Sequence, residues 1–403
     1  MRPISRFFFL VSLAILAIPV CAFAQTSPFL AAPYVGTAGF QAKGIALADL
    51  NGDGILDLVT LTPCTVQFTC APAYAAVSLG NGDGTFKPAV TYGTGPGGGT
   101  SVTVRDVNGD GKPDLIVSVD VFNYPAAVGG VSILLGNGDG TFQPAVSYAS
   151  GGGTAYAVAL ADTNADGKLD VIVANECPVG NIVSCSANGV IGVLLGNGDG
   201  TFQAAVSYSS GRCSPQSIAA ADLNGDGSVD LLIGSFCNVS IMFGAGDGTF
   251  QPPSQILASG GFVAAGDVNG DGKIDVLVDV PALPNSVTSP SGTIDVLVGD
   301  GHGTFTLTNS YAAAVSSNIV IADVNGDGKP DLVVGASCNT GCETAGVGIF
   351  LGNGDGTFQA ARTYESGGEA TSYMAVGDID GDGNLDIAVT NQCAFTCNAS
   401  HDL

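Results

Sequence analysis

One pattern recurs seven times along the chain and constrains its fold more than any other feature. It reads Asp-x-Asn/Asp-x-Asp-Gly-x-x-Asp, and its copies begin at Asp49, Asp106, Asp162, Asp222, Asp267, Asp323 and Asp378. A second pattern, close to Leu-Gly-Asn-Gly-Asp-Gly-Thr-Phe, follows each of the first six copies and ends at Phe86, Phe142, Phe202, Phe250, Phe305 and Phe358. Successive copies are 45 to 60 residues apart. Repeats of this length indicate a solenoid, a propeller or an array.

Each repeat contains four short apolar runs separated by turn-forming residues. In the third repeat they are Tyr156–Ala161, Leu169–Ala174, Val190–Leu195 and Thr201–Tyr208. Runs this short, bounded by Gly, Asn and Asp, favour strands over helices. The Asn-Gly-Asp-Gly turn favours a tight hairpin, because Gly and Asn tolerate positive φ. Four antiparallel strands per repeat, arranged radially, predict an all-β, seven-bladed β-propeller of four-stranded blades. The Ala- and Gly-rich first run suits the crowded position near the axis.

The seventh repeat ends at Leu403, before a third strand and a Gly-Asp-Gly turn. Residues Phe29–Tyr34 loosely resemble the outer strand Phe202–Tyr208. A strand from the N-terminus would remove free edges from the ring. We therefore expect a last blade that is incomplete or closed by the N-terminal strand, and a truncated chain is the remaining alternative.

The two patterns together resemble the FG-GAP/VCBS repeat family, the unit of the integrin α-subunit propeller and of many exported bacterial proteins. The resemblance covers about residues 28–403 and depends on seven loops in register. It implies a calcium-binding β-propeller over residues 25–403. It does not imply one activity, because the same fold serves many functions.

Each Asp-rich loop offers a set of oxygen ligands. In the first loop, Asp49, Asn51 and Asp53 present side-chain oxygens, Ile55 a carbonyl, and Asp57 closes the site. Calcium prefers six to eight oxygen ligands, whereas magnesium keeps its waters and takes fewer protein ligands. The predicted ligands are Asp49, Asn51, Asp53, Ile55, Asp57; Asp106, Asn108, Asp110, Lys112, Asp114; Asp162, Asn164, Asp166, Lys168, Asp170; Asp222, Asn224, Asp226, Ser228, Asp230; Asp267, Asn269, Asp271, Lys273, Asp275; Asp323, Asn325, Asp327, Lys329, Asp331; and Asp378, Asp380, Asp382, Asn384, Asp386.

Metal-free turns rich in Asp and Asn are the alternative, and charge argues against it. The loops hold 22 of the 36 acidic residues. Clustered carboxylates repel one another unless a cation compensates. We therefore expect about seven structural Ca²⁺ ions, one for each of the seven loops.

The charge balance and the N-terminus suggest where the protein works. A formal charge of −25 excludes nucleic acid and anionic membranes as expected partners, because both select clustered Lys and Arg. Residues 1–24 read as a signal peptide, with basic Arg2 and Arg6, the short apolar run Phe7–Val20 and an Ala22-Phe23-Ala24 cleavage site. A membrane anchor fits these flanks poorly, and a lipoprotein at Cys21 is disfavoured by the bulky Val20. We expect a monomer without a transmembrane segment, secreted to the periplasm, cell surface or medium.

Ten cysteines remain after the signal peptide, and they fall into five local pairs. The pairs are Cys64 and Cys70, Cys177 and Cys185, Cys213 and Cys237, Cys338 and Cys342, and Cys393 and Cys397. An even number, close spacing and export predict disulfides. Zinc is the alternative, but no pair has C-x-x-C spacing or His partners.

The metal loops and hairpin turns are expected on one face of the propeller, and the variable loops on the other. The variable loops are Thr62–Ala75, Asp120–Gly130, Asn175–Gly189, Val280–Gly292 and Ser337–Gly346. All ten cysteines map to this variable face. Binding usually involves such loops on a rigid scaffold, and disulfides lower the cost of ordering them. Phe68, Phe122, Tyr124 and Phe395 are candidate ligand contacts, with local packing an equal alternative.

The leading hypothesis is a secreted or cell-surface module that binds a protein or carbohydrate, with adhesion as one such role. The alternative is an extracellular polysaccharide lyase or hydrolase, and a purely structural spacer is the third. His302 and His401 are the two histidines, basic residues are scarce, and no nucleophile elbow or zinc motif occurs. No catalytic residue is therefore assigned. Carboxylate-only glycosidase chemistry stays open. Its candidates are Asp120, Glu176, Asp279, Asp295 and Glu343.

Overall fold

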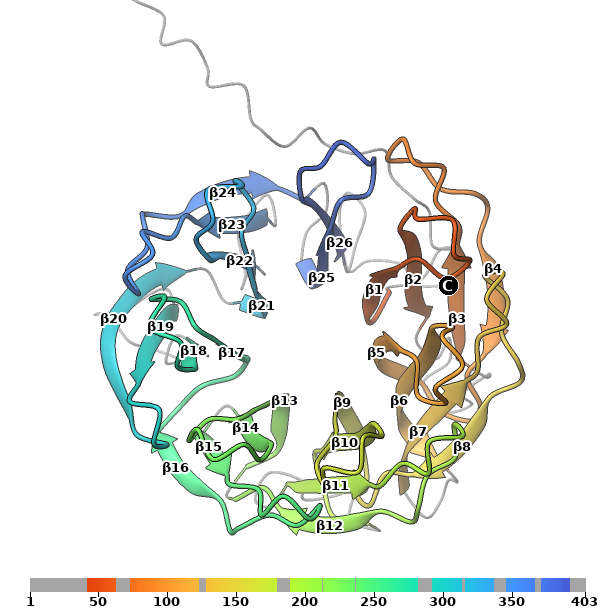
Figure 1. The fold of residues 1–403 in the computed structure, drawn as a ribbon, viewed down its shortest axis with the longest axis horizontal. Helices are drawn as coiled ribbons and strands as arrows, with labels where there is room; N and C mark the ends of the chain where they lie inside the picture. Colours follow the sequence, from red (N-terminus) through yellow and green to blue (C-terminus); the bar gives the residue numbers. More distant parts are fainter. Residues whose placement is uncertain are drawn as a thin grey trace, which may run out of the picture. The chain divides into compact units, whose positions relative to one another are not determined.

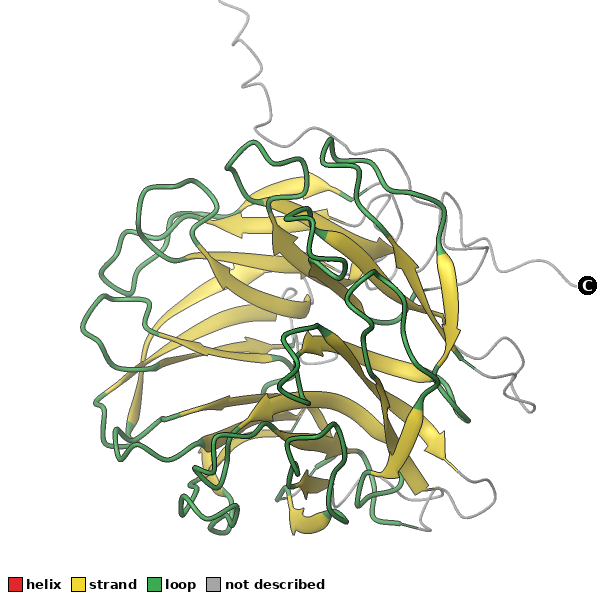
Figure 2. Ribbon diagram, turned by 45° about the vertical axis from the view of Figure 1, so that its right-hand side comes forward, coloured by secondary structure: helices red, strands yellow, loops and turns green. Residues whose placement is uncertain are grey.

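The computed structural model describes residues 42–62, 73–122, 128–179, 189–211, 213–235, 237–281, 292–313, 316–336, 346–366 and 371–391. They belong to one compact unit, residues 31–403. The described residues form strands and loops and no helix, so none of them could cross a membrane as a helix (Figure 2). The all-β prediction is confirmed. The predicted signal peptide and Phe29–Tyr34 lie outside the described residues.

The sheets follow one another around a central axis, as β-propeller blades (Figure 1). The first three blades are β1 (Ile45–Ala48), β2 (Asp57–Thr62), β3 (Tyr74–Ser78) and β4 (Val90–Gly93); β5 (Gly99–Arg105), β6 (Asp114–Phe122), β7 (Val128–Leu134) and β8 (Val146–Ala149); and β9 (Ala155–Ala161), β10 (Asp170–Asn175), β11 (Val190–Leu194) and β12 (Val206–Ser209).

The next three blades have the same consecutive strand order. They are β13 (Pro215–Ala221), β14 (Asp230–Ser235), β15 (Asn238–Met242) and β16 (Ser254–Leu257); β17 (Val263–Gly266), β18 (Asp275–Val280), β19 (Gly292–Gly299) and β20 (Phe305–Ala313); and β21 (Ser316–Ala322), β22 (Asp331–Ala336), β23 (Gly346–Phe350) and β24 (Arg362–Glu365). All pairings are antiparallel, as predicted.

The seventh repeat forms a two-stranded sheet of β25 (Thr371–Gly377) and β26 (Asp386–Asn391). β25 contacts both β21 and β1, so the sheet stands between the sixth and first blades. The predicted number of seven four-stranded blades is therefore wrong, and the structure has six. The physical reason is that a metal loop needs only the two strands that it joins, and the seventh loop joins β25 to β26 without a described third or fourth strand.

The hydrophobic core lies between neighbouring blades. One buried cluster joins Val59 and Leu61 of the first blade to Val102, Leu115 and Val117 of the second, and four further clusters join later neighbours. The second strand of a blade has neighbours on both faces, so it is an uninterrupted apolar run rather than an alternating one. Every residue of β10 and β14 is buried for this reason.

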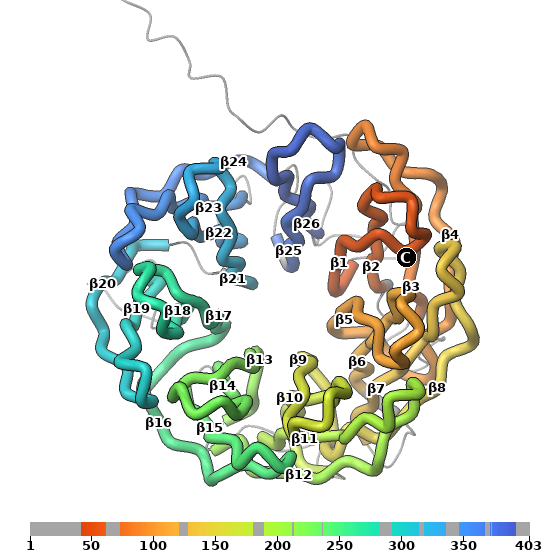
Figure 3. The backbone as a smooth tube through the Cα atoms, in the orientation of Figure 1, coloured from red at the N-terminus to blue at the C-terminus, as the bar shows by residue number. Residues whose placement is uncertain are grey.

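The first strand of each blade lies nearest the axis (Figure 3). These strands are rich in small residues, such as Ala157, Ala159 and Ala161 of β9, which are half-buried. The prediction that Ala- and Gly-rich strands occupy this crowded position is confirmed.

Candidate metal-binding loops

Each Asp-rich loop links the first strand of a blade to the second, and its own backbone shapes it. In the first loop, Asp49 Oδ1 accepts the N–H of Gly52 at 2.7 Å, and Asp49 Oδ2 accepts that of Gly54 at 2.8 Å. Asn51 Oδ1 accepts the N–H of Asp53 at 2.8 Å, and Asp53 Oδ1 accepts that of Ile55 at 2.9 Å. These bonds gather the side-chain oxygens of positions one, three and five in one tight turn.

The fourth and sixth residues of the loop have positive φ, which favours glycine. The third loop departs from the others, because Ala165 takes the fourth position at φ 57°. Among the described residues, Ala165 is the one non-glycine with positive φ. The hydrogen bonds of the loop therefore hold Ala165 in a left-handed conformation that costs an alanine roughly 1–2 kcal/mol.

The Asp at position nine is buried rather than exposed in the loop. Asp57 Oδ2 accepts the N–H of Leu50 at 2.9 Å, and Asp57 Oδ1 accepts that of Gly80 at 2.8 Å. Gly80 pairs with Phe86 across the hairpin turn, so this carboxylate joins the metal loop to the other turn of its blade. Sequence reasoning missed this use of Asp57, although the strand that follows it was a signal of burial. Its role as the closing ligand stays a prediction.

The same carboxylate takes both bonds in all six four-stranded blades. Asp57, Asp114, Asp170, Asp230, Asp275 and Asp331 are each 0 % exposed. Their Oδ1 atoms accept the N–H groups of Gly80, Gly136, Gly196, Gly244, Gly299 and Gly352. Each blade therefore has a buried anion where its two turns meet.

Burial raises the pKa of the carboxyls of Asp57, Asp114, Asp230, Asp275 and Asp331. The two backbone N–H groups offset part of this rise. In the first loop, the charges of Asp53 and Asp49 raise the pKa of Asp57 further. The negative charges of a loop thus repel one another, and a bound cation would relieve that repulsion.

The donor chemistry of the loops fits a hard cation. Asp378, Asp380 and Asp382 each direct a carboxylate oxygen to within 4.8 Å of the others. In the other six loops the third position is Asn, whose amide oxygen is also a hard donor. Oxygen donors without His or Cys are those that calcium prefers.

The hairpin turn of one blade covers the metal loop of the preceding blade. The N–H of Gly140 in the second blade donates to the carbonyl of Leu50 at 3.1 Å, and that of Gly248 in the fourth donates to Thr163 at 3.0 Å. Sequence reasoning missed this cover, because it joins different repeats.

Aromatic contacts strengthen the same interfaces between blades. Tyr92 of the first blade meets Phe142 of the second edge-to-face, with ring centroids 5.3 Å apart. Tyr148 meets Phe202 at 5.6 Å in the next interface. The Phe that ends the hairpin pattern is therefore a packing residue at Phe142, Phe202, Phe250 and Phe358, and its recurrence was the available signal.

The opposite face carries the disulfides. Cys213 and Cys237 are bonded, as predicted, and Cys177 is also disulfide-bonded. The other predicted cysteines lie outside the described residues, as do Phe68, Tyr124, Phe395, Glu343 and the side chain of Phe122.

Two of the candidate carboxylates are engaged in local bonds. Asp120 Oδ1 accepts the N–H of Gly98 at 2.7 Å, and Asp295 Oδ1 accepts the hydroxyl of Thr293 at 2.9 Å. These hydrogen bonds indicate that both side chains stabilise the local backbone and strand conformation.

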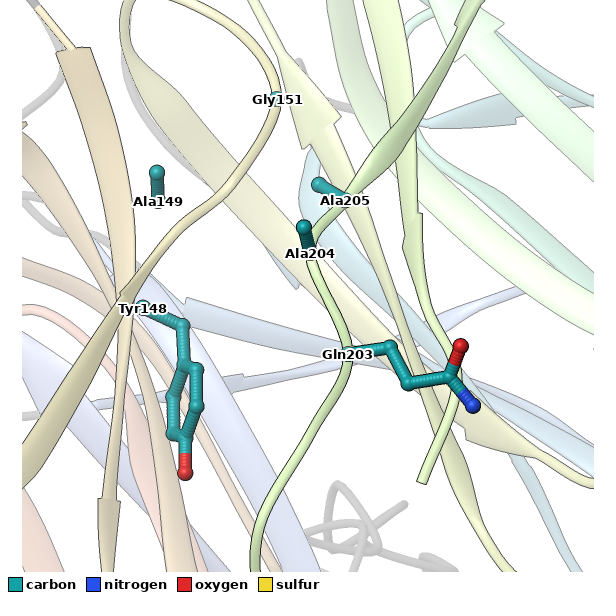
Figure 4. A pocket seen from close by; sticks show the side chains of 6 residues that line it. All are labelled: Tyr148, Ala149, Gly151, Gln203, Ala204 and Ala205. Atoms are coloured by element: carbon teal, nitrogen blue, oxygen red, sulfur yellow. The ribbon is translucent and has the colours of Figure 1, made fainter. Parts of the chain in front are cut away.

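A cavity of about 440 Å³ lies between the second and third blades (Figure 4). Tyr148, Ala149 and Gly151 form one side, and Gln203, Ala204 and Ala205 the other. Three other blades carry proline, Pro88, Pro144 and Pro252, where the third carries Ala204.

The comparisons with known proteins agree with this fold. The model of the FG-GAP-like repeat matches six segments, residues 68–117, 119–173, 181–233, 222–278, 286–334 and 323–389. No curated protein matches the chain.

The solved structures that are similar to the chain include the following three. An Agrocybe aegerita lectin, described as recognising non-reducing terminal N-acetylglucosamine, has a TM-score of 0.53 and 19 % identity, over 88 % of this chain and 87 % of the lectin. The V. cholerae biofilm matrix protein Bap1 has a TM-score of 0.42 and 23 % identity, over 68 % of this chain and 40 % of its own. NanB, solved with Optactamide, has a TM-score of 0.46 and 11 % identity, over 90 % of this chain and 68 % of its own.

Proposed function

Because this chain belongs to the FG-GAP-like repeat family, we propose that it is an exported, calcium-stabilised propeller that binds a carbohydrate or a protein. The observation that carries the binding role is the division between its faces. One face repeats the same loops and turns, while the other has loops of unequal length held by the Cys213–Cys237 disulfide. Pre-ordered loops on a rigid scaffold lose less entropy when they bind.

Calcium is proposed for the Asp-rich loops because of their donors and their charge. The loops gather oxygen donors in one tight turn, as Asp49, Asn51 and Asp53 do. Burial chiefly raises the pKa of Asp57, and the nearby charges of Asp53 and Asp49 raise it further, a repulsion that a cation would relieve. Seven such loops would together bind about seven ions, for a chain of formal charge −25.

Carbohydrate is the first ligand class to test. The lectin described above shares the fold and recognises a sugar, although its 19 % identity supports the fold alone. The cavity beside Tyr148 adds an observation from this chain, because it combines an aromatic ring with alanine methyl groups. Such mixed surfaces suit the apolar faces of sugars.

A glycan array and a pull-down of surface proteins, both with calcium present, test the binding role. The matched variant is Ala204→Pro, which copies the residue of three other blades. If the cavity binds, this variant keeps its melting temperature and loses the array signal. A signal that survives Ala204→Pro assigns binding to the variable loops, and the absence of any ligand in both experiments contradicts the proposal.

An extracellular polysaccharide-degrading enzyme is the second candidate. Asp120 and Glu176 belong to the variable face, where a polymer would meet them. Turnover of a polysaccharide that is lost in Asp120→Asn or Glu176→Gln, but kept when loop aspartates change, would favour catalysis over binding.

A further inference from the structure

Two tyrosines meet across the central axis of the ring. Tyr156 lies near the start of β9 in the third blade, and Tyr373 lies near the start of β25 in the seventh sheet. These two strands stand on opposite sides of the central space (Figure 3). The two hydroxyl groups are hydrogen-bonded to each other. Because the first strands begin on the face opposite the metal loops, this bond spans the axis at the end of the variable face.

The two ends of the first strands differ in what the fold requires of them. At the metal end, the residue before the loop is small in six of the seven repeats: Ala48, Ala161, Ala221, Gly266, Ala322 and Gly377. At the other end, the sixth residue before each loop differs among most repeats: Lys43, Thr100, Tyr156, Gln216, Gly261, Ser317 and Ser372. The other repeats form the same strand without an aromatic residue at that position, so the blade itself does not require Tyr156.

Glu176 lies beside Tyr156 on a segment that hydrogen bonds hold in place. Its N–H donates to the carbonyl of Thr154 at 2.8 Å, and its own carbonyl accepts the hydroxyl of Ser214 at 3.0 Å. The next residue, Cys177, is disulfide-bonded. The carboxylate of Glu176 forms no hydrogen bond or ion pair with any residue that the structure describes. A carboxylate with a fixed backbone and no described partner is available to a ligand.

The two tyrosines combine accessible ring surface with ordered hydroxyl groups. Both side chains are half-buried, so part of each ring remains accessible. Burial raises the pKa of Tyr156 and of Tyr373, and the nearby charge of Glu176 raises that of Tyr156 further, so both hydroxyls stay neutral. Next to Tyr373, the amide of Asn318 in β21 donates to the carbonyl of Met374 at 3.4 Å. This bond ties β25 to the neighbouring blade and helps to fix the ring.

From this arrangement we propose that Tyr156, Tyr373 and Glu176 form a saccharide-binding site at the centre of the variable face. The rings provide apolar surface for the C–H groups of a pyranose, and Glu176 accepts hydrogen bonds from its hydroxyl groups. The site rests on the binding role proposed above and assigns a place and a ligand class to it. It is separate from the cavity beside Tyr148, which lies between the second and third blades.

Charge narrows the class of saccharide. Glu176 brings a negative charge into the site, and the whole chain has a formal charge of −25. Both repel a ligand that carries a carboxylate or a sulfate group. An ionised carboxylate accepts hydrogen bonds and donates none, so it matches hydroxyl or amino groups. The expected ligand is therefore a neutral or amino-bearing saccharide rather than an acidic one.

Tyrosine fluorescence tests the site directly, because the chain has no tryptophan and 10 tyrosines. The purified protein, with calcium, is titrated with glucose, galactose, glucosamine and glucuronate, and then with any saccharide that gives a signal on a glycan array. We expect a saturable change in emission with at least one neutral or amino saccharide. Glucuronate should bind at least about tenfold more weakly than that saccharide.

Glu176→Gln is the most informative variant, because this carboxylate bonds to no described residue. We expect an unchanged melting temperature and saccharide binding weaker by about tenfold, as for the loss of a hydrogen bond to a charged group. Glu365→Gln, at the exposed end of β24, is the control and should bind like the wild type.

A second variant tests the two tyrosines without removing their rings. The double variant Tyr156→Phe, Tyr373→Phe loses the bond that orders the rings, so it should bind the saccharide about threefold more weakly or worse. Tyr148→Phe, at the separate cavity, is its control and should bind like the wild type.

The outcomes separate this site from the binding role itself. Saccharide binding that is unchanged in Glu176→Gln and in the double tyrosine variant overturns the site and leaves the binding role in place. A lower melting temperature of the double variant with unchanged saccharide binding means that the tyrosine bond only stabilises the ring, which also overturns the site. If no saccharide binds the wild type, in titration or on the array, the site is overturned, and the pull-down of surface proteins then tests the binding role alone.

Discussion

Asp114 and Gly136 are 22 residues apart in the sequence, yet Asp114 Oδ1 accepts the N–H of Gly136 at 2.7 Å in the buried centre of the second blade. The same carboxylate accepts the N–H of Val107 at 2.9 Å through Oδ2. One side chain thus fixes both turns of a blade, and equivalent pairs recur in the other five blades.

Removing this carboxylate should destabilise the fold even without metal. In Asp114→Ala, the N–H groups of Val107 and Gly136 lose their acceptor in a buried site. We expect a loss of about 2–6 kcal/mol, because each of the two buried donors left unsatisfied costs about 1–3 kcal/mol. Urea unfolding in EDTA measures this without a contribution from calcium. Asp139→Ala, in an exposed turn, is the control, and an equal loss in both variants would contradict the role of Asp114.

The glycine of the pair should be irreplaceable for steric reasons. In Gly136→Ala, the new Cβ would lie 2.1 Å from the carbonyl oxygen of Pro113. We expect a loss of about 1–3 kcal/mol or more, as for other overpacked sites. Gly93→Ala is the control, because no atom lies within 4 Å of its added Cβ. Melting curves that shift equally for both variants would refute the steric explanation.

Chelation should lower the melting temperature if the loops bind calcium. A ligand that binds only the folded protein stabilises it by about 2.7 kcal/mol per site at a hundredfold excess over Kd. Scanning calorimetry with and without EDTA measures the change, and readdition of calcium against magnesium identifies the ion. A melt that EDTA leaves unchanged would exclude structural calcium.

The chelated protein should become more stable as the pH falls from neutral toward about 4. Burial raises the pKa of Asp57, Asp114 and Asp275 above the ordinary 3.8. Groups of this kind stabilise the fold fully below 3.8, and this stability is lost as the pH rises through their folded pKa.

Other aspartates set the acid limit of this trend. Hydrogen bonds from Thr85 and Thr141 lower the pKa of Asp83 and Asp139. Their stabilisation is present above 3.8 and is lost as the pH falls through their lowered folded pKa. Stability in EDTA should therefore pass through a maximum near pH 4, as urea midpoints between pH 3 and pH 7 would show. A steady decline on acidification from pH 7 would contradict the raised pKa values.

Loss of the Cys213–Cys237 disulfide should destabilise the loops of the variable face, and calcium binding on the opposite face should persist. The Cys213–Cys237 bond closes a loop with a sequence separation of 24 residues. Its removal in a Cys213→Ser, Cys237→Ser double variant should cost about 3 kcal/mol. Calcium binding, followed by calorimetric titration, should persist in this variant. Loss of calcium binding would mean that the two faces are coupled.

The sequence predicted features that repeat locally, and it missed those that join repeats. The spacing of Asp49, Asn51 and Asp53 and the short apolar runs were enough to predict the strands, the loops and the order of the blades. The cover of Leu50 by the turn at Gly140 involves residues 90 positions apart, which no local pattern indicates. The count of seven blades was taken from the seven metal loops and failed, because the seventh repeat forms a two-stranded sheet among the described residues.

The contacts between blades all run the same way around the ring, because the hairpin turn of each blade covers the metal loop of the blade before it. Damage to the loop that contains Leu50 should therefore loosen the second blade, whose turn binds this loop, before it loosens the first. Under mechanical tension, such a ring would open at its weakest joint. That joint is at Val324, where the reaching turn is missing among the described residues. Force would therefore part the seventh sheet from the sixth blade first, and the ring would open beside β25.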